Sequence, residues 1–136
     1  MRIIAGAIIR DTQGRYLLVQ ERQEKVRGLW NIPAGWADND ESPDQAAIRE
    51  TKEEVGMDIV IGAEPLHRFV NEQKQSEYYA FLAQEYSGEL VVQANELLDA
   101  KWLSYQDVVK LHAANQIREP WIFNALEKAE HAYSRH

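Results

Sequence analysis

Short apolar runs separated by turn residues recur along the chain, and they predict a mixed α/β fold. The runs at residues 3–9 and 16–20 flank a turn sequence at 11–14, which predicts that they pair as a hairpin. A polar, basic loop follows at 21–29, and Pro33 is typical of an edge strand or a strand end. Further strands are expected at 59–61, 66–70, 78–82, 90–92 and 100–103, and helices at 104–114 and 119–133.

The clearest helix signal lies between Ser42 and Gly56. Ser42 can cap the first turn, Pro43 suits the first helical position, and Gln45 completes a capping box with Ser42. Gly56 supplies the stop that helices often have at their C-terminal end. We therefore expect a central helix with strands on both sides of it in the sequence.

Composition supports one folded domain over residues 1–136. Hydrophobic residues make up 45% and charged residues 27% of the chain, which is enough apolar material for a core. The chain has no cysteine, which excludes a disulfide scaffold, a thiolate metal site and a cysteine nucleophile. The run at 1–11 is too short to span a membrane and lacks a signal-peptide cleavage site, so we expect a cytoplasmic protein without membrane partners.

The charge is negative and unevenly distributed. The net charge of −7 disfavours binding to a nucleic-acid polymer, because such proteins neutralise phosphates with a basic surface. Residues 35–57 alone contain seven acidic and two basic side chains, which is a net charge of −5. A concentration of this kind calls for a local explanation.

Three glutamates of the predicted central helix share one face. Glu50, Glu53 and Glu54 are spaced i, i+3 and i+4, so their carboxylates point to the same side. Like charges at these spacings destabilise a helix, and a divalent cation that prefers oxygen ligands would remove the conflict. The alternative is a solvated acidic face that Arg49 and Lys52 partly neutralise.

The residues around these glutamates resemble a known family. Gly35 is followed at fixed spacings by Glu41 and by the run 49–57, RETKEEVGM, and this 23-residue pattern is similar to the signature of the Nudix hydrolases. The departures are mild: Thr51 stands where the family usually has an aliphatic residue, and Met57 stands where Ile, Leu or Val is more usual. The resemblance implies an α/β/α sandwich with a central mixed β-sheet, against which the catalytic helix packs.

The resemblance also implies a metal-dependent active site that hydrolyses a diphosphate bond. Mg²⁺ or Mn²⁺ would be the cofactor, and Gly35 would let backbone amides approach the diphosphate. Arg49 matches the arginine that orients a catalytic glutamate. Glu50, Glu53 and Glu54 match the metal ligands of the family. Glu41 matches an earlier acidic residue that either binds metal or buttresses the loop.

The identity of the general base stays open at this point. Within the family this role falls either on a glutamate of the signature or on a glutamate in a later loop. Glu53 is the first candidate. Glu96 is the second, although it could instead be a metal ligand or a loop carboxylate that faces water.

The substrate is only broadly indicated. Arg22, Lys25 and Arg27 could bind terminal phosphates, or they could belong to an ordinary solvated loop. Trp36 and Tyr78 are candidates for stacking on an aromatic ring, and core packing is the alternative for each. We expect the substrate to be a nucleoside di- or triphosphate or a small organic diphosphate. A rival hypothesis is a Nudix-like sensor that binds a nucleotide without hydrolysing it, and homodimers are common in the family.

Overall fold

The computed structural model describes residues 1–134. The helices are α1 (Pro43–Val55), α2 (Tyr105–Ala113) and α3 (Pro120–Ser134), and a short 3-10 helix lies at Glu24–Val26. The strands are β1 (Arg2–Ile8), β2 (Tyr16–Glu21), β3 (Trp30–Asn31), β4 (Ala34–Trp36), β5 (Asp58–Ile61), β6 (His67–Asn71), β7 (Ser76–Ser87) and β8 (Leu97–Leu103). The mixed α/β fold class is confirmed.

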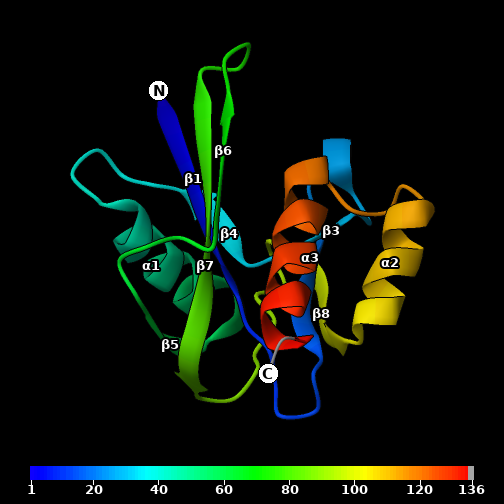
Figure 1. The fold of residues 1–136 in the computed structure, drawn as a ribbon. Helices are drawn as coiled ribbons and strands as arrows, with labels where there is room; N and C mark the ends of the chain where they lie inside the picture. Colours follow the sequence, from blue (N-terminus) through cyan, green and yellow to red (C-terminus); the bar gives the residue numbers. More distant parts are fainter. Residues whose placement is uncertain (135–136) are drawn as a thin grey trace.

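The strands form two sheets. In the larger sheet the order is β4-β1-β7-β5 with β6 also paired to β7, and β1 runs parallel to β7 while the other pairs are antiparallel. The smaller sheet, β3-β2-β8, is antiparallel. Figure 1 shows α1 on one side of the larger sheet and α3 on the other, with α2 outermost. The expected central mixed sheet between helices is therefore present, with a second sheet beside it.

The expected hairpin of residues 3–9 and 16–20 forms only at its turn, through an antiparallel bridge between Arg10 and Tyr16, and the pairing expected beyond the turn is wrong. A tight turn does connect the two segments, and the Leu17 amide donates to the Ile9 carbonyl at 3.0 Å. Beyond this turn the strands separate, because β1 already has β4 and β7 as partners on its two edges. β2 instead pairs with β3 and β8 in the smaller sheet.

The expected strand at 90–92 is also wrong. This segment lies across the C-terminal end of α1, where the Val91 amide donates to the Val55 carbonyl at 2.9 Å and the Gln93 amide to the Glu54 carbonyl at 3.1 Å. Leu90 and Val92 pack against a buried apolar cluster. The apolar pattern of residues 90–92 therefore reflects a loop that packs against the core. Conversely, sequence analysis missed β4, whose Gly35 and Trp36 do not have a strand-like pattern.

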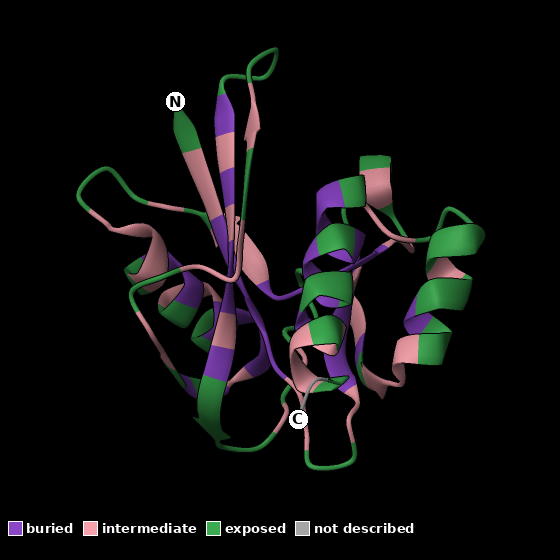
Figure 2. Ribbon diagram, viewed as in Figure 1, coloured by how far each residue is buried: buried purple, intermediate pink, exposed green. Residues whose placement is uncertain are grey.

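The central helix is fixed in place by its caps and its buried face. The Ser42 amide donates to Gln45 Oε1 at 3.1 Å, which confirms the capping box, and Gly56 has a φ of 72° at the C-terminal cap. Ala47 and Thr51 are fully buried, and the Thr51 hydroxyl donates to the Ala47 carbonyl at 2.7 Å. Figure 2 shows that α1 has buried residues on one side and exposed residues on the other. This arrangement holds the acidic face of α1 at a fixed position beside β4.

Within residues 1–134, none of the helices is both long and apolar enough to cross a membrane.

Candidate active site

A cleft of about 470 Å³ lies where α1, β4 and the end of β2 meet the turn before β8 and the loop before α3. Its lining includes five carboxylates and two guanidinium groups, those of Glu21, Asp38, Glu50, Glu54, Glu96, Arg49 and Arg118. The two glutamates of α1 that line it, Glu50 and Glu54, were predicted as metal ligands from the sequence. The cleft is therefore acidic, and it also contains one arginine from α1 and one from the loop before α3.

Glu54 is the most deeply buried of these carboxylates. Its residue is only 5% exposed, and Oε2 accepts a hydrogen bond of 3.0 Å from the Ala34 amide of β4. Burial, followed by the nearby carboxylates of Glu50 and Glu21, raises the pKa of Glu54 to about 9. A buried carboxylate that faces other carboxylates is stabilised in its charged form only when a cation joins it.

Glu50 lies over the backbone of β4. A side chain built at Gly35 would overlap the Glu50 carboxylate, so the absence of a side chain at position 35 is what lets Glu50 lie there. Burial raises the pKa of Glu50, and the Arg49 guanidinium opposes this rise. Gly35 therefore leaves room for a carboxylate of the site, while the approach of its backbone to a diphosphate stays a prediction.

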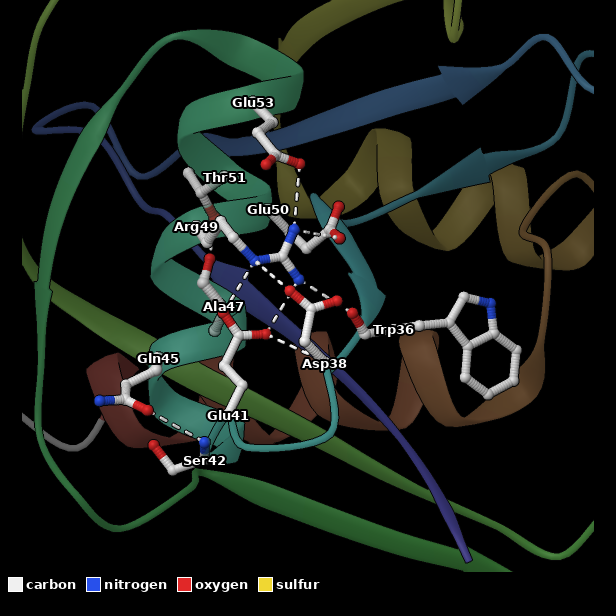
Figure 3. A network of polar contacts seen from close by, with 10 residues as sticks. All are labelled: Trp36, Asp38, Glu41, Ser42, Gln45, Ala47, Arg49, Glu50, Thr51 and Glu53. Carbon is white, nitrogen blue, oxygen red and sulfur yellow. Dashed lines mark hydrogen bonds and ion pairs between the residues drawn. The ribbon is translucent and has the colours of Figure 1, made fainter.

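Arg49 connects the remaining acidic residues of the signature (Figure 3). Its Nε and Nη2 donate to the two oxygens of Glu41 at 2.7 and 2.9 Å. Its Nη1 donates to Glu50 at 3.0 Å and to Glu53 at 3.1 Å, and Nη2 also donates to the Trp36 carbonyl at 3.0 Å. These contacts hold the pKa of Glu41 below its usual range. Arg49 therefore contacts Glu50 and Glu53 of α1 together with Glu41, and its role in orienting a catalytic glutamate stays a prediction.

The two candidates for the general base lie in different surroundings. The Glu53 side chain is 55% exposed and is outside the lining of the cleft, where Arg49 holds it. Glu96 lies in the turn before β8 and lines the cleft, close enough to raise the pKa values of Glu50 and Glu54. Only Glu96 is brought into the cleft itself.

The donor set suits a divalent cation, although the carboxylates are not gathered around one point. Carboxylate oxygens are the ligands that Mg²⁺ and Mn²⁺ prefer, and the buried Glu54 lacks a compensating cation within hydrogen-bond distance in the described chain. Across residues 1–134, no three acidic or histidine side chains are close enough to share one ion. Glu50 and Glu53 are instead paired with the Arg49 guanidinium. To bind an ion, their carboxylates have to release this guanidinium and contact the metal in its place.

The predicted substrate-binding residues are only partly brought together. Trp36 is 46% exposed and lines the cleft, while the Arg2 guanidinium covers its ring at 3.8 Å. Tyr78 is buried and packs against Trp121 with ring centroids 5.1 Å apart. Trp36, Tyr78 and Trp121 together line a smaller pocket of about 90 Å³ beside the cleft. Tyr78 thus belongs to the core and also contributes to the wall of this pocket.

The basic side chains of the loop at 21–29 do not line the cleft. Arg22, Lys25 and Arg27 are exposed, and Arg27 Nη1 donates to the Arg22 carbonyl at 3.3 Å. Sequence analysis missed Glu21 and Arg118, which do line the cleft. No motif marks either residue, and they lie 97 positions apart, so only the packing of the loop before α3 onto β3 brings them together.

Comparison with known proteins decides the family. The model of the NUDIX domain matches residues 1–125. The chain belongs to the Nudix family. The fold and the positions of the signature residues around one cleft agree with this membership. The relatives described next are named as a hydrolase and a phosphatase, which agrees with an interpretation of the acidic helix as part of an active site.

The relatives of this Nudix chain include longer enzymes. The NAD-capped RNA hydrolase NudC of Pseudomonas putida is 31% identical over 120 residues, which cover 85% of this chain and 42% of that protein. The 8-oxo-dGDP phosphatase NUDT18 of Danio rerio is 31% identical over 115 residues, which cover 81% of this chain and 34% of that protein. The chain therefore spans less than half the length of these curated relatives.

Two solved structures share the fold over the whole chain. The E. coli ORF135 protein superposes with a TM-score of 0.81 at 24% identity, and the match covers 100% of this chain and 93% of that one. An Ap4A hydrolase from C. elegans gives a TM-score of 0.77 at 24% identity, with 100% of both chains covered. At these identities the likeness shows the fold alone.

The pKa of Glu54 predicts how stability depends on pH without metal. In the unfolded chain this group titrates near its ordinary value of 4.5, whereas in the folded chain it keeps its proton up to about pH 9. The folded state thus binds more protons between these values, and the free energy of unfolding falls as pH rises through this window. Thermal melts in a chelator should show a lower melting temperature at pH 8.5 than at pH 5.5, by roughly 5 °C or more.

The matched variant is Glu54→Gln, whose amide oxygen can still accept from the Ala34 amide and which carries no charge at any pH. Its melting temperature should change less between pH 5.5 and 8.5 than that of the wild type. Equal slopes in the two proteins would show that Glu54 does not hold a buried proton.

Proposed function

We propose that the chain is a metal-dependent hydrolase that cleaves a diphosphate bond in a nucleotide or a related small organic diphosphate. The observation that carries this proposal is the position of Glu50 and Glu54, which line one cleft together with Glu96 and Arg49. A structural acidic face would point into solvent, whereas Glu54 is buried, and this burial together with the neighbouring carboxylates raises its pKa. The names of the relatives, which include an 8-oxo-dGDP phosphatase and an NAD-capped RNA hydrolase, support the same class of substrate.

Mg²⁺ or Mn²⁺ is the cofactor that this donor set suits. Glu50 and Glu54 would hold the ion, and Glu53 and Glu41 would join them when Arg49 releases their carboxylates. A bound divalent cation neutralises charge on the diphosphate and lowers the pKa of the attacking water. Arg49 keeps the carboxylates of α1 close to the cleft before the ion binds, because its guanidinium contacts Glu41, Glu50 and Glu53 together.

Glu96 is the general base in this proposal. It lines the cleft, while Glu53 is held outside the lining by Arg49. Glu96 would accept the proton of the attacking water as the new phosphorus–oxygen bond forms and the bridging phosphorus–oxygen bond breaks. In a pH profile of kcat, Glu96→Gln should remove the acidic limb that a carboxylate base produces, whereas a loss of metal binding would chiefly change the metal dependence.

The smaller aromatic pocket is suited to the organic part of the substrate. Trp36, Tyr78 and Trp121 form its apolar walls, and Asn31 and Glu119 add polar groups. Its volume of about 90 Å³ limits the buried group to part of one ring. Trp36 borders both hollows, so an aromatic ring that stacks on it would place an attached diphosphate in the acidic cleft.

A substrate panel tests the proposed function. The purified chain is incubated with nucleoside di- and triphosphates, dinucleotides and small organic diphosphates, with Mg²⁺, with Mn²⁺ and with a chelator, and release of phosphate or pyrophosphate is measured. We expect hydrolysis of at least one class that stops in the chelator. Nucleotide binding without turnover under all metal conditions would support the sensor hypothesis and overturn this proposal.

A further inference from the structure

The loop before α3 places a second arginine in the cleft, and its position is set by the backbone. The Arg118 amide donates to the Trp30 carbonyl at 2.9 Å, and the Trp30 amide donates to the Gln116 carbonyl at 2.8 Å. These bonds form a parallel bridge between Trp30 and Ile117, which ties the loop to β3. The side chain of Arg118 then extends from a fixed backbone toward the acidic end of β2.

Two buried polar residues, Glu21 and Asn31, fix the position of the Arg118 guanidinium. Glu21 is only 7% exposed, and its Oε2 lies 3.4 Å from Arg118 Nη1. Its other oxygen accepts a hydrogen bond of 3.3 Å from Asn31 Nδ2, and Asn31 Oδ1 accepts from the Ile32 amide at 2.8 Å. The Asn31 amide is thereby oriented toward Glu21, so the carboxylate that faces Arg118 is itself fixed.

The donors of Arg118 are available, in contrast to those of Arg49. Arg49 uses Nε, Nη1 and Nη2 in hydrogen bonds to carboxylates and to the Trp36 carbonyl. Within residues 1–134, the Arg118 guanidinium has only its ion pair with Glu21, at a distance too long for a strong hydrogen bond. Its side chain is 33% exposed. Its other N–H groups are therefore free of protein partners in the described chain, in a residue that lines the cleft.

Arg118 also lines both hollows. It belongs to the wall of the 470 Å³ cleft that contains Glu50 and Glu54, and to the wall of the 90 Å³ aromatic pocket that contains Tyr78 and Trp121. It is thus placed at the junction between the two. A substrate whose ring enters the pocket and whose diphosphate enters the cleft has its first phosphate group at this junction.

We propose that Arg118 binds the phosphate group next to the organic part of the substrate, and that Glu21 is the positioning residue that aims its guanidinium. This inference rests on the proposed function, since it assumes that a diphosphate enters the cleft. Arginine suits the task because its planar set of donors matches two phosphate oxygens at once. It also supplies positive charge to the cleft from the loop before α3, whereas the carboxylates of Glu50 and Glu54 come from α1.

The first test measures binding without turnover. Calorimetry with Mg²⁺ compares the wild type, Arg118→Gln and Arg118→Lys, using imidodiphosphate and α,β-methylene-ADP as probes that resist hydrolysis. Losing a charged hydrogen bond to phosphate should weaken the binding of both probes by about 10- to 100-fold in Arg118→Gln. Arg118→Lys should give a smaller loss, because it keeps the charge without the paired donors. Arg68→Gln is the matched control, since Arg68 also pairs with a glutamate, Glu77 at 3.1 Å, but lies outside the cleft.

The second test separates positioning from simple charge. If Glu21 only added negative charge, Glu21→Gln would tighten the binding of both anionic probes. If it aims Arg118, Glu21→Gln should weaken binding by several-fold, and this loss should vanish in the Arg118→Gln background. The double variant also tests whether Arg118→Gln loses affinity merely because it leaves Glu21 buried without its partner, because in that case removing the Glu21 charge would restore the affinity. Thermal melts of all variants report whether each of them folds.

Each outcome has a defined meaning. Weaker binding of α,β-methylene-ADP alone would place Arg118 against the organic group and overturn the proposal, and so would unchanged affinity or a wild type that binds neither probe. Turnover that is insensitive to Arg118 would leave the proposed function intact while this inference fails. Probe binding that depends on Arg118, in a chain that hydrolyses none of the panel, would overturn the function alone.

Discussion

Glu54→Gln should lower kcat by about 1000-fold, because a divalent cation supplies several kcal/mol of transition-state stabilisation and this carboxylate is its most buried ligand in the proposed site. The substitution keeps the shape of the side chain and an oxygen that can accept from the Ala34 amide, so the fold should persist. Steady-state kinetics on a substrate found with the panel measures the loss. Titration with Mn²⁺ in the same assay should show that the apparent metal affinity has also fallen.

Glu53→Gln is expected to give a loss of the same order if Glu53 leaves Arg49 to bind the ion. Glu85→Gln is the matched control, since Glu85 is an exposed glutamate of β7 outside the lining of the cleft. More than a tenth of the wild-type kcat in Glu54→Gln, with unchanged metal dependence, would contradict the assignment of this cleft as the active site. Full activity in Glu53→Gln alone would remove only that residue from the ligand set.

Gly35→Ala should lower kcat/KM by about 100-fold, which is the cost of moving a reacting group by about 1 Å. The added methyl group would overlap the Glu50 carboxylate, and the flexible end of that side chain would have to move. Stability should change little, because a carboxylate yields more easily than backbone. Kinetics together with thermal melts measure the two effects separately.

Gly62→Ala is the control for this substitution. A side chain built at Gly62 would meet only Gln84 Nε2, at 3.4 Å, and Gly62 is not part of the cleft. Its activity should stay close to that of the wild type. If Gly35→Ala also kept its activity, then the position of Glu50 over β4 would be unimportant for catalysis.

The helix that carries the site could be predicted because its signals are local. The capping box of Ser42 and Gln45 and the stop at Gly56 act within one turn of the chain, and the spacing of the three glutamates follows from helix geometry. The family could also be identified from the same 23 residues, and the NUDIX match confirms it. Arg49 was singled out for the same reason, since it belongs to the signature.

The rest of the fold could not be predicted from local patterns. Two apolar runs joined by turn residues resemble a hairpin, but β1 has both of its edges occupied by strands that lie far away in sequence. An extended apolar segment such as 90–92 has the same pattern whether it pairs in a sheet or packs along the end of a helix. Strand pairing depends on which edges are free, and this is a property of the whole chain.

The sequence by itself determined the family and the acidic face of α1, because these depend on the spacing of residues within one short segment of the chain, and it predicted which carboxylates would bind a divalent cation. Only the tertiary structure decided which charges meet in the cleft. It buried Glu54 under β4, placed Glu50 over Gly35, brought in Glu96 and left the basic side chains of Arg22, Lys25 and Arg27 outside. It also joined Glu21 to Arg118 across 97 positions, since two side chains with no shared motif meet only when the loop before α3 docks on β3.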